Sequence, residues 1–200
     1  LIHLRDTLDP DIIGIQETKV NDPEFPVDEI KEIGYHPEYW GQKGHYGVAI
    51  LSKKKPIEVQ KGFIKDTDED QKRFIQAKFK WGKESITIMN GYFPQGENRS
   101  HETKFPKKIK YYSDLKKHIK KTQKTEDNLI VMGDFNVAPS PLDIGIGEIN
   151  AKRWLKEGKT AFLPEEIDMW NSIKDLGFID SWREQNPDEG STYSWFDYRS

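Results

Sequence analysis

Short apolar runs alternate with polar segments along the chain, and two of these runs end close to an acidic residue. Residues 11–15 lead into Glu17, and residues 129–132 lead into Asp134. Each run predicts a short buried strand whose carboxyl end turns toward solvent. Because an unpaired charge beside apolar packing is costly, each carboxylate needs a cation, a hydrogen-bond donor or water. If the fold brings the two strand ends together, their carboxylate oxygens would suit magnesium or manganese. An acidic residue at a single strand end is more often part of a turn or the start of a helix.

The remaining pattern predicts strands and helices in mixed order. Residues 47–51 and 73–80 predict strands, and a turn at 81–84 leads into a third strand over 85–90, which gives an antiparallel, half-buried hairpin. Helical spacing predicts an opening helix that ends before Pro10 and further helices around 109–119, 154–155 and 167–176. The apolar face of the longest helix is expected to consist of Ile109, Tyr112, Leu115 and Ile119. Strands interleaved with helices favour a layered α/β sandwich over a strictly alternating doubly wound sheet.

Composition narrows the class of protein. Two hundred residues without an internal repeat or low-complexity linker predict one domain over 1–200, and six Trp among 12% aromatic residues argue against disorder. No segment reads as a membrane span or a signal peptide. Cysteine is absent, which excludes disulfides and thiolate zinc sites. We therefore expect a monomeric protein in the reducing cytoplasm that does not bind membranes.

Charge gives no overall attraction to nucleic acid, because the net charge is −3. The distribution is uneven, since residues 104–121 contain eight Lys and a single acidic residue, Asp114. For most of these lysines we expect a solvated helix face. Whether some of them contact DNA stays open at this stage.

The motifs around the strand ends resemble the exonuclease III family of bacterial DNA-repair nucleases, a branch of the endonuclease/exonuclease/phosphatase superfamily. The motifs that carry this resemblance run in family order: IGIQETKV (13–20), GQKGHYGVAILSK (41–53), NGYFPQGENR (90–99), VMGDFNVAPSPLDIGI (131–146), KRWL (152–155), FLPEE (162–166) and SWFDYRS (194–200). The wider superfamily shares only the Glu of QET and the GDFN motif. The resemblance implies a four-layer α/β sandwich of the DNase I type, which agrees with the hydrophobic pattern.

The resemblance also implies roles for the acidic strand ends. Glu17 corresponds to a metal-binding glutamate, with Mg²⁺ as the expected cofactor and Mn²⁺ as the alternative. Asp134 corresponds to the aspartate that orients or deprotonates the attacking water. Asn136, two positions further in a segment expected to be extended, should point to the same side and offer a neutral donor to a phosphoryl oxygen or to the water.

Three polar residues are similar to family residues near the scissile phosphate. Tyr92 corresponds to a tyrosine whose hydroxyl donates to developing negative charge, although a half-buried strand aromatic is an equally good reading of the residue alone. Gln95 in the same loop resembles a DNA-contact side chain. Arg73 resembles an arginine that engages DNA, although a lone Arg at the start of a strand is usually a surface residue.

Near the end of the chain, Trp195 and Phe196 resemble the aromatic wall that accepts a flipped-out baseless sugar. An abasic site has already lost its stacking, so its extrusion costs little and an apolar pocket selects against a bulky base. Read without the resemblance, the two residues are at least as well explained as a core aromatic pair. The loop with His45 and Tyr46 is read as structural.

The chain departs from the family pattern at both ends. Family members begin with a strand that carries an Asn-Gly motif, and they end with an Asp that orients a catalytic His in a Ser-Asp-His motif. The five histidines, none of which lies in that motif, are His3, His36, His45, His101 and His118. We therefore expect both terminal segments of the domain to be missing from these 200 residues, and a protein made of them alone to be inactive and poorly folded.

For the parent protein, the resemblance implies a metal-dependent nuclease acting on double-stranded DNA and on abasic-site DNA. The implied activities are 3′→5′ exonuclease, abasic-site endonuclease and 3′-phosphatase, all of them phosphoester hydrolyses. One alternative is another phosphoesterase of the superfamily, such as a sphingomyelinase-like enzyme or an inositol-phosphate phosphatase. The other alternative is a non-catalytic DNA-binding relative. The carboxylates argue against it, because they repel phosphate and a binding module has no need of them.

Overall fold

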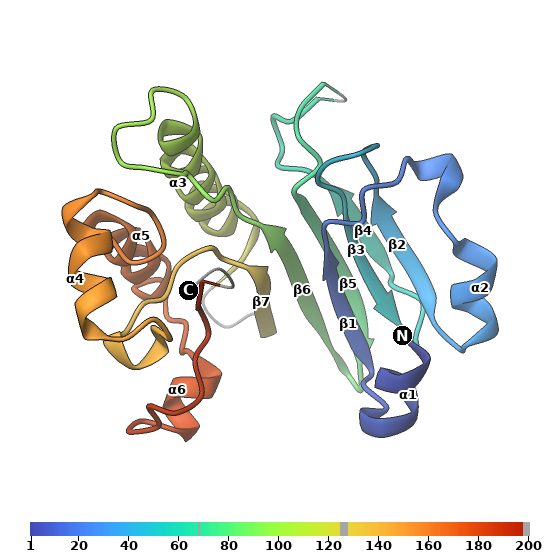
Figure 1. The fold of residues 1–200 in the computed structure, drawn as a ribbon. Helices are drawn as coiled ribbons and strands as arrows, with labels where there is room; N and C mark the ends of the chain where they lie inside the picture. Colours follow the sequence, from blue (N-terminus) through green and yellow to red (C-terminus); the bar gives the residue numbers. More distant parts are fainter. Residues whose placement is uncertain (68, 125–127, 198–200) are drawn as a thin grey trace. The chain divides into compact units, whose positions relative to one another are not determined.

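The computed structural model describes residues 1–67, 69–124 and 128–197, which form two compact units (Figure 1). The first unit comprises residues 1–67, 69–92 and 128–135, and the second comprises residues 93–124 and 136–197. The last three residues of the SWFDYRS motif lie outside the described residues.

The first unit contains a three-stranded antiparallel sheet in the order β1-β3-β2. Its strands are β1 (Ile12–Gln16), β2 (His36–Trp40) and β3 (Val48–Ser52). Helix α1 (Ile2–Leu8) ends before Pro10, as predicted, and α2 (Val27–Glu32) lies on the outer side of this sheet in Figure 1. The apolar contacts under α2 are made by Phe25, Ile30, Tyr35, Ala49 and Leu51.

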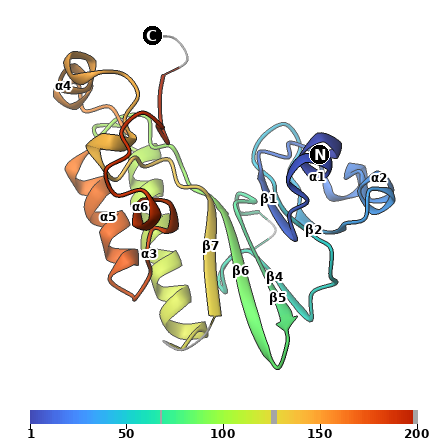
Figure 2. The same cartoon turned by 90° about the horizontal axis from the view of Figure 1, so that it is seen from below.

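A four-stranded sheet in the order β4-β5-β6-β7 completes the first unit (Figure 2). Its strands are β4 (Glu58–Lys61), β5 (Phe74–Trp81), β6 (Glu84–Tyr92) and β7 (Asn128–Asp134). The β5–β6 hairpin is antiparallel, as predicted, whereas β6 and β7 are parallel. A parallel pair needs a long crossover connection, and here the connection contains a long helix.

The two sheets pack face to face around one apolar core. Val48 and Ile50 of β3 face Ile75, Ala77, Phe79 and Ile88 of the hairpin in a single buried cluster. Burial of this face against the other sheet is a principal stabilisation of a sheet sandwich. The expectation of a half-buried hairpin is wrong, because Phe74 and Met89 on the opposite face are buried as well.

The second unit is mainly helical. Its helices are α3 (Lys104–Thr122), α4 (Glu148–Lys156), α5 (Pro164–Lys174) and α6 (Ser181–Gln185), with a 3₁₀ turn, η2, at Pro141–Asp143. Helices α3 and α5 pack against each other (Figures 1 and 2). A second apolar cluster consists of Ala138, Ile146, Ala161 and Phe162, with Trp154 and Trp195 packed against it.

The prediction that β1 and β7 are buried strands is wrong. Each is the outermost strand of its sheet among the described residues. Side chains of β1 are only partly buried, and Ile130 of β7 is 46% exposed. An outermost strand packs on fewer neighbours than a central one, which explains why an apolar run here is not enclosed.

The predicted face of α3 is wrong at one position. Ile109 is 45% exposed, whereas its neighbour Lys108 is fully buried. Phe105, Lys108, Tyr112, Leu115 and Ile119 follow the 3–4-residue spacing of one helix face, and all five are buried. Sequence patterning does not place a lysine on such a face, because its charge needs a buried partner.

No helix in the described part of the chain is long and apolar enough to cross a membrane.

Candidate active site

Glu17 and Tyr92 meet at one end of the two sheets of the first unit. Glu17 directly follows β1, and Tyr92 is the last residue of β6. The Tyr92 hydroxyl donates a hydrogen bond to Glu17 Oε1, and Lys19 Nζ lies 2.9 Å from Glu17 Oε2. The loop that carries Glu17 is held by backbone bonds from Thr18 N and Lys19 N to the segment before β3. Two strands from different sheets thus present one carboxylate and one hydroxyl to each other.

Asn90 joins the two sheets just below this pair. Its side chain is fully buried, and its Nδ2 donates to the carbonyl oxygens of Ile15 and Ala49, each at 2.9 Å. Its Oδ1 accepts a hydrogen bond from Gln16 Nε2 at 2.6 Å. Because Gln16 precedes Glu17 and Asn90 lies two residues before Tyr92, these bonds fix the spacing of the two strand ends.

The two side chains shift each other's ionisation in opposite directions. The pKa of the Glu17 carboxyl is lowered, first by the hydrogen bond from Tyr92 and then by Lys19. Burial raises the pKa of the Tyr92 hydroxyl, and the hydrogen bond to Glu17 raises it further. At neutral pH the site therefore holds an anionic carboxylate beside a protonated hydroxyl donor.

Arg73 is held beside Tyr92 by contacts on two sides. The centre of its guanidinium lies 4.1 Å from the ring centroid of Tyr46 and 4.7 Å from that of Tyr92. Its Nη1 donates to Tyr92 O at 3.0 Å, and its Nε donates to Gln71 Oε1 at 2.7 Å. Contacts with aromatic rings suit a guanidinium, and together with the two hydrogen bonds they restrict its rotation. The cation is therefore placed in advance rather than ordered by a ligand.

Tyr46 belongs to this site through its contact with Arg73, although the sequence did not indicate it. Besides stacking on Arg73, its hydroxyl accepts a hydrogen bond from Gln71 Nε2 at 3.0 Å. Tyr46 lies in a polar loop without periodic spacing, so no pattern indicated its contact with Arg73. Its membership of the GQKGHYG motif was the one signal available.

Asp134 ends β7 beside Tyr92 of β6, in the parallel pairing of the two strands. Its side chain is exposed, and its charge is among the influences that raise the pKa of Tyr92. The first unit thus collects Glu17, Arg73, Tyr92 and Asp134 at the ends of its strands.

Glu17 offers oxygen ligands of the kind that hard divalent cations take, because its lowered pKa keeps the carboxylate ionised. One carboxylate supplies only part of a coordination shell. Within residues 1–67, 69–124 and 128–197, no three His, Asp or Glu side chains gather closely enough to hold a metal ion. The chemistry of Glu17 fits a divalent cation that takes its remaining ligands from water or from substrate oxygens.

Asn136 and Gln95 belong to the second unit. Asn136 has a left-handed backbone (φ 52°), and its Nδ2 donates to Phe93 O at 2.9 Å. The prediction that Asp134 and Asn136 share one side of an extended segment is wrong, since β7 ends at Asp134 and the backbone turns at Asn136. Gln95 is exposed, and its amide bridges Thr160 Oγ1 at 3.0 Å and Glu97 N at 2.7 Å.

The two terminal aromatic residues have different surroundings. The Trp195 ring lies 5.2 Å from Trp154 and 5.5 Å from Phe162 in edge-to-face contacts, so it packs as part of the second unit's core. Phe196 is 45% exposed. A core aromatic therefore lies next to an accessible one, rather than two core aromatics side by side.

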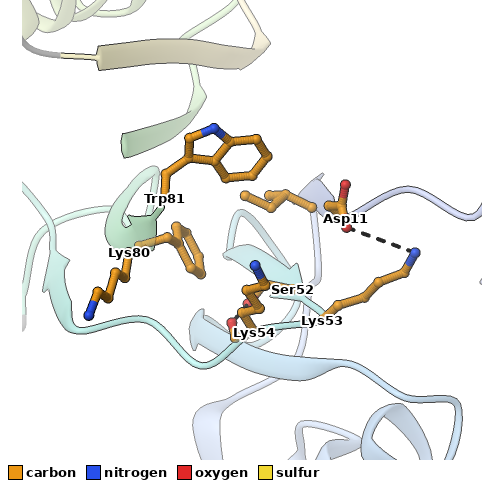
Figure 3. A pocket seen from close by; sticks show the side chains of 8 residues that line it. Asp11, Ser52, Lys53, Lys54, Lys80 and Trp81 are labelled. Atoms are coloured by element: carbon orange, nitrogen blue, oxygen red, sulfur yellow. Dashed lines mark hydrogen bonds and ion pairs between the residues drawn. The ribbon is translucent and has the colours of Figure 1, made fainter. Parts of the chain in front are cut away.

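A small pocket opens at the opposite end of β1 from Glu17 (Figure 3). Lys53, Lys54 and Trp81 line it, and Lys53 pairs with Asp11. Its volume of about 20 Å³ is that of roughly one water molecule. It is too small for a nucleotide, so the strand ends at Glu17 remain the better candidate site.

Taken together, the packed sheets and the carboxylates at their strand ends define an α/β sandwich with an acidic site. Residues 1–200 match the Endonuclease/Exonuclease/phosphatase family, and the chain belongs to this family. It is 49% identical over 191 residues to Exodeoxyribonuclease III of Haemophilus influenzae, an alignment that covers 96% of this chain and 72% of that protein.

Solved structures agree with the family. The structure of an AP endonuclease from Archaeoglobus fulgidus is similar with a TM-score of 0.86 and 33% identity, covering 100% of this chain and 73% of that one. The 3′ phosphatase NExo from Neisseria bound to a product DNA hairpin is similar with a TM-score of 0.85 and 30% identity, covering 99% and 72%. These similarities confirm the predicted DNase I-like α/β fold class.

Proposed function

We propose that the protein is a divalent-metal-dependent DNA-repair nuclease that hydrolyses phosphodiester bonds of duplex DNA. The observation that carries this proposal is the hydrogen-bonded Glu17–Tyr92 pair at the strand ends, in a chain 49% identical to an Exodeoxyribonuclease III. A purely DNA-binding relative would gain nothing from an ionised carboxylate held in place beside a phosphate site.

The first unit supplies groups for binding a phosphate and for the hydrolytic step. We assign Glu17 to a divalent cation, with Mg²⁺ expected and Mn²⁺ as the alternative; when bound, the cation neutralises phosphoryl charge. Tyr92, whose single hydroxyl hydrogen bonds Glu17 in the structure, would redirect that hydrogen bond to charge that develops on the phosphoryl oxygens. Arg73, held beside two aromatic rings, provides a cation for a phosphate. Asp134 orients the attacking water or takes its proton.

The second unit supplies further groups in this proposal. Asn136 offers an uncharged donor to the water or to a phosphoryl oxygen, where a second carboxylate would repel the phosphate. Gln95 contacts DNA. The exposed Phe196, together with its chain neighbour Trp195, receives the sugar of an abasic site, which has no base to stack. The proposed reactions are those of a 3′→5′ exonuclease, an abasic-site endonuclease and a 3′-phosphatase, all of them phosphoester hydrolyses.

The partners follow from the same reasoning. Double-stranded DNA and abasic-site DNA are the proposed substrates. A cytoplasmic location is a proposal that rests on the cysteine-free composition. A monomeric state is proposed as well.

The deciding experiment compares the full-length protein with its Asp134→Ala variant on a duplex that contains one abasic-site analogue. We expect incision with Mg²⁺, none with EDTA, and a decrease of about 10²-fold or more in the variant. Asp11→Ala is the matched control, because Asp11 precedes β1 at the end opposite Glu17. Its incision rate should equal that of the wild type.

A wild-type protein that binds the duplex without cutting it would instead support a DNA-binding module. A wild-type protein that cleaves a phospholipid analogue would support a different phosphoesterase.

A further inference from the structure

Lys108 is fully buried in the middle of α3, although the helix is otherwise rich in exposed lysines. Its Nζ donates to Glu166 of α5, to Asn136 O at 2.7 Å and to Gln95 O at 3.2 Å. An ammonium group has three hydrogens, so three acceptors match its capacity. Two of these acceptors are backbone atoms of residues assigned above to the active site.

Glu166 is equally enclosed and equally well bonded. Its side chain is fully buried, and its Oε2 accepts hydrogen bonds from Ala161 N and Leu163 N, each at 2.8 Å. The Lys108–Glu166 pair therefore joins α3 and α5 to three loop segments, at residues 95, 136 and 161–163. All of these contacts lie within the second unit.

The surrounding loops are shaped to this lysine. Gly96 has a φ of +91°, and a Cβ there would lie 3.1 Å from Lys108 Cδ and 3.0 Å from Thr160 Cγ2. The lysine stem thus packs against the backbone of the Gln95 loop, and its ammonium group binds the carbonyl before Gly96. A larger residue at position 96 would displace the loop from the lysine.

Overall stability alone is a weak explanation for such a pair. Removing two charges from water costs about as much as their attraction returns, and apolar residues of similar volume often stabilise a core as well or better. What an apolar pair cannot do is hold two carbonyl oxygens in place by directed hydrogen bonds. The pair is therefore better explained by the geometry that it imposes on the loops.

We propose that Lys108 and Glu166 are positioning residues for the active site, and that they act by fixing the backbones of Asn136 and Gln95. The proposal rests on the function proposed above. Asn136 is held at both ends, by Lys108 at its carbonyl and by Phe93 O at its side chain. Loss of the ammonium group removes one bond to the Asn136 carbonyl, and the side-chain amide of Asn136 then shifts from the position that its proposed role requires.

The test uses the full-length protein with Lys108→Met, which keeps the stem and removes the ammonium group. We expect kcat on abasic duplex DNA to fall about 10²-fold, since small misplacements of a reacting group have effects of this size. Lys107→Met is the matched control, because Lys107 is the exposed neighbour on the same helix. Its kcat and KM should equal those of the wild type.

A double variant, Lys108→Met with Glu166→Gln, separates positioning from folding. The two charges leave together, and the Gln oxygen can still accept from Ala161 N and Leu163 N, so we expect the melting temperature to recover toward that of the wild type. If kcat stays low in this stable variant, the pair positions the loops. If kcat recovers together with the melting temperature, the pair is merely structural and the proposal is overturned. Where the single variant does not fold, the double variant carries the test.

Amide hydrogen exchange gives a readout that does not depend on activity. In the double variant, exchange at residues 95–97 and 136–138 should quicken relative to wild type, while exchange in β5 and β6 stays unchanged. A wild-type protein that cuts no DNA would contradict the proposed function, and quickened exchange would still support the anchoring of the loops. Unchanged exchange at both loops would overturn the positioning role.

Discussion

At the scale of single residues, the Glu17–Tyr92 contact decides the charge of the candidate site. The pKa of Glu17 lies below its usual 4.5, chiefly because Tyr92 donates to the ionised form. A lowered folded-state pKa stabilises the fold above the unfolded-state pKa, and this contribution is lost as pH falls through the lowered value. The Glu17 side chain is 46% exposed, so solvent screening keeps this contribution small. The main consequence is therefore for activity at acidic pH.

Tyr92→Phe removes that hydrogen bond and leaves the ring. We expect the pKa of Glu17 to rise toward 4.5, because the main cause of its lowering is gone. The acidic limb of the pH–activity profile should move to higher pH, and kcat at neutral pH should fall about 10²-fold because the hydroxyl donor is absent. Measuring kcat from pH 3 to 8 on abasic duplex DNA, with an NMR titration of the Glu17 carboxyl, checks both effects. An unchanged Glu17 titration would mean that Tyr92 does not stabilise the carboxylate.

The sequence named candidate residues at the strand ends of the first unit, but not how they are held. Glu17, Tyr92 and Asp134 were named because they lie in motifs that follow or end predicted strands, whereas Arg73 was named from the family resemblance alone. Tyr46 and Lys108 were missed, because a stacking contact or a buried ion pair depends on a partner far away in sequence. Single-sequence patterns record the properties of a position and say nothing of its distant partners.

At the scale of secondary-structure elements, the parallel pairing of β6 and β7 depends on Gly133. Gly91 and Gly133 face each other across the pair, directly before Tyr92 and Asp134. A Cβ at Gly133 would lie 2.0 Å from Gly91 O, and the φ of Gly133 is +132°. No other residue allows this approach, so the glycine of the GDFN motif serves the register of the strand that carries Asp134.

Gly133→Ala should therefore destabilise the protein strongly, by about 3 kcal/mol or more, because a backbone oxygen cannot move aside as a flexible side chain can. Gly34→Ala is the matched control, with a φ of +92° and no atom within 4 Å of the added Cβ. It should cost only the backbone strain, roughly 1–2 kcal/mol. Urea denaturation of both variants measures the difference. Equal decreases in stability would show that the close approach to Gly91 does not matter.

The predicted elements were largely correct, and the errors have physical reasons. The β5–β6 hairpin was predicted because alternation and a Gly-containing turn are local signals, and both are present in the structure. Burial of β1 and β7 could not be judged, since the same apolar run serves a central or an outermost strand. The face of α3 was misassigned at Ile109 because the true face includes Lys108.

At the scale of the whole molecule, charge limits how the protein attracts DNA. The net charge is −3, and several exposed lysines of α3 are already paired, such as Lys104 with Glu97 and Lys110 with Asp114. Binding should therefore depend on a few placed contacts such as Arg73 rather than on a broad basic surface. The charge pattern thus predicts a modest salt dependence.

We expect the affinity for an abasic duplex to fall by roughly 10²-fold between 50 and 200 mM salt, as for about four neutralised phosphates. Neutralising six to ten phosphates would cost about 10³–10⁵-fold over the same range. Fluorescence anisotropy in EDTA, where no cleavage is expected, gives the slope of log K against log salt.

The triple variant Lys107→Gln, Lys120→Gln and Lys121→Gln then tests whether α3 contributes to DNA affinity. A solvated helix face leaves the slope unchanged, whereas on a DNA-binding face the slope becomes shallower by about 0.9 for each phosphate that these lysines neutralise in the wild type. Because Arg73→Gln should make the slope shallower by about one phosphate in the same assay, the two variants together separate the strand-end site from the helix as the source of DNA affinity.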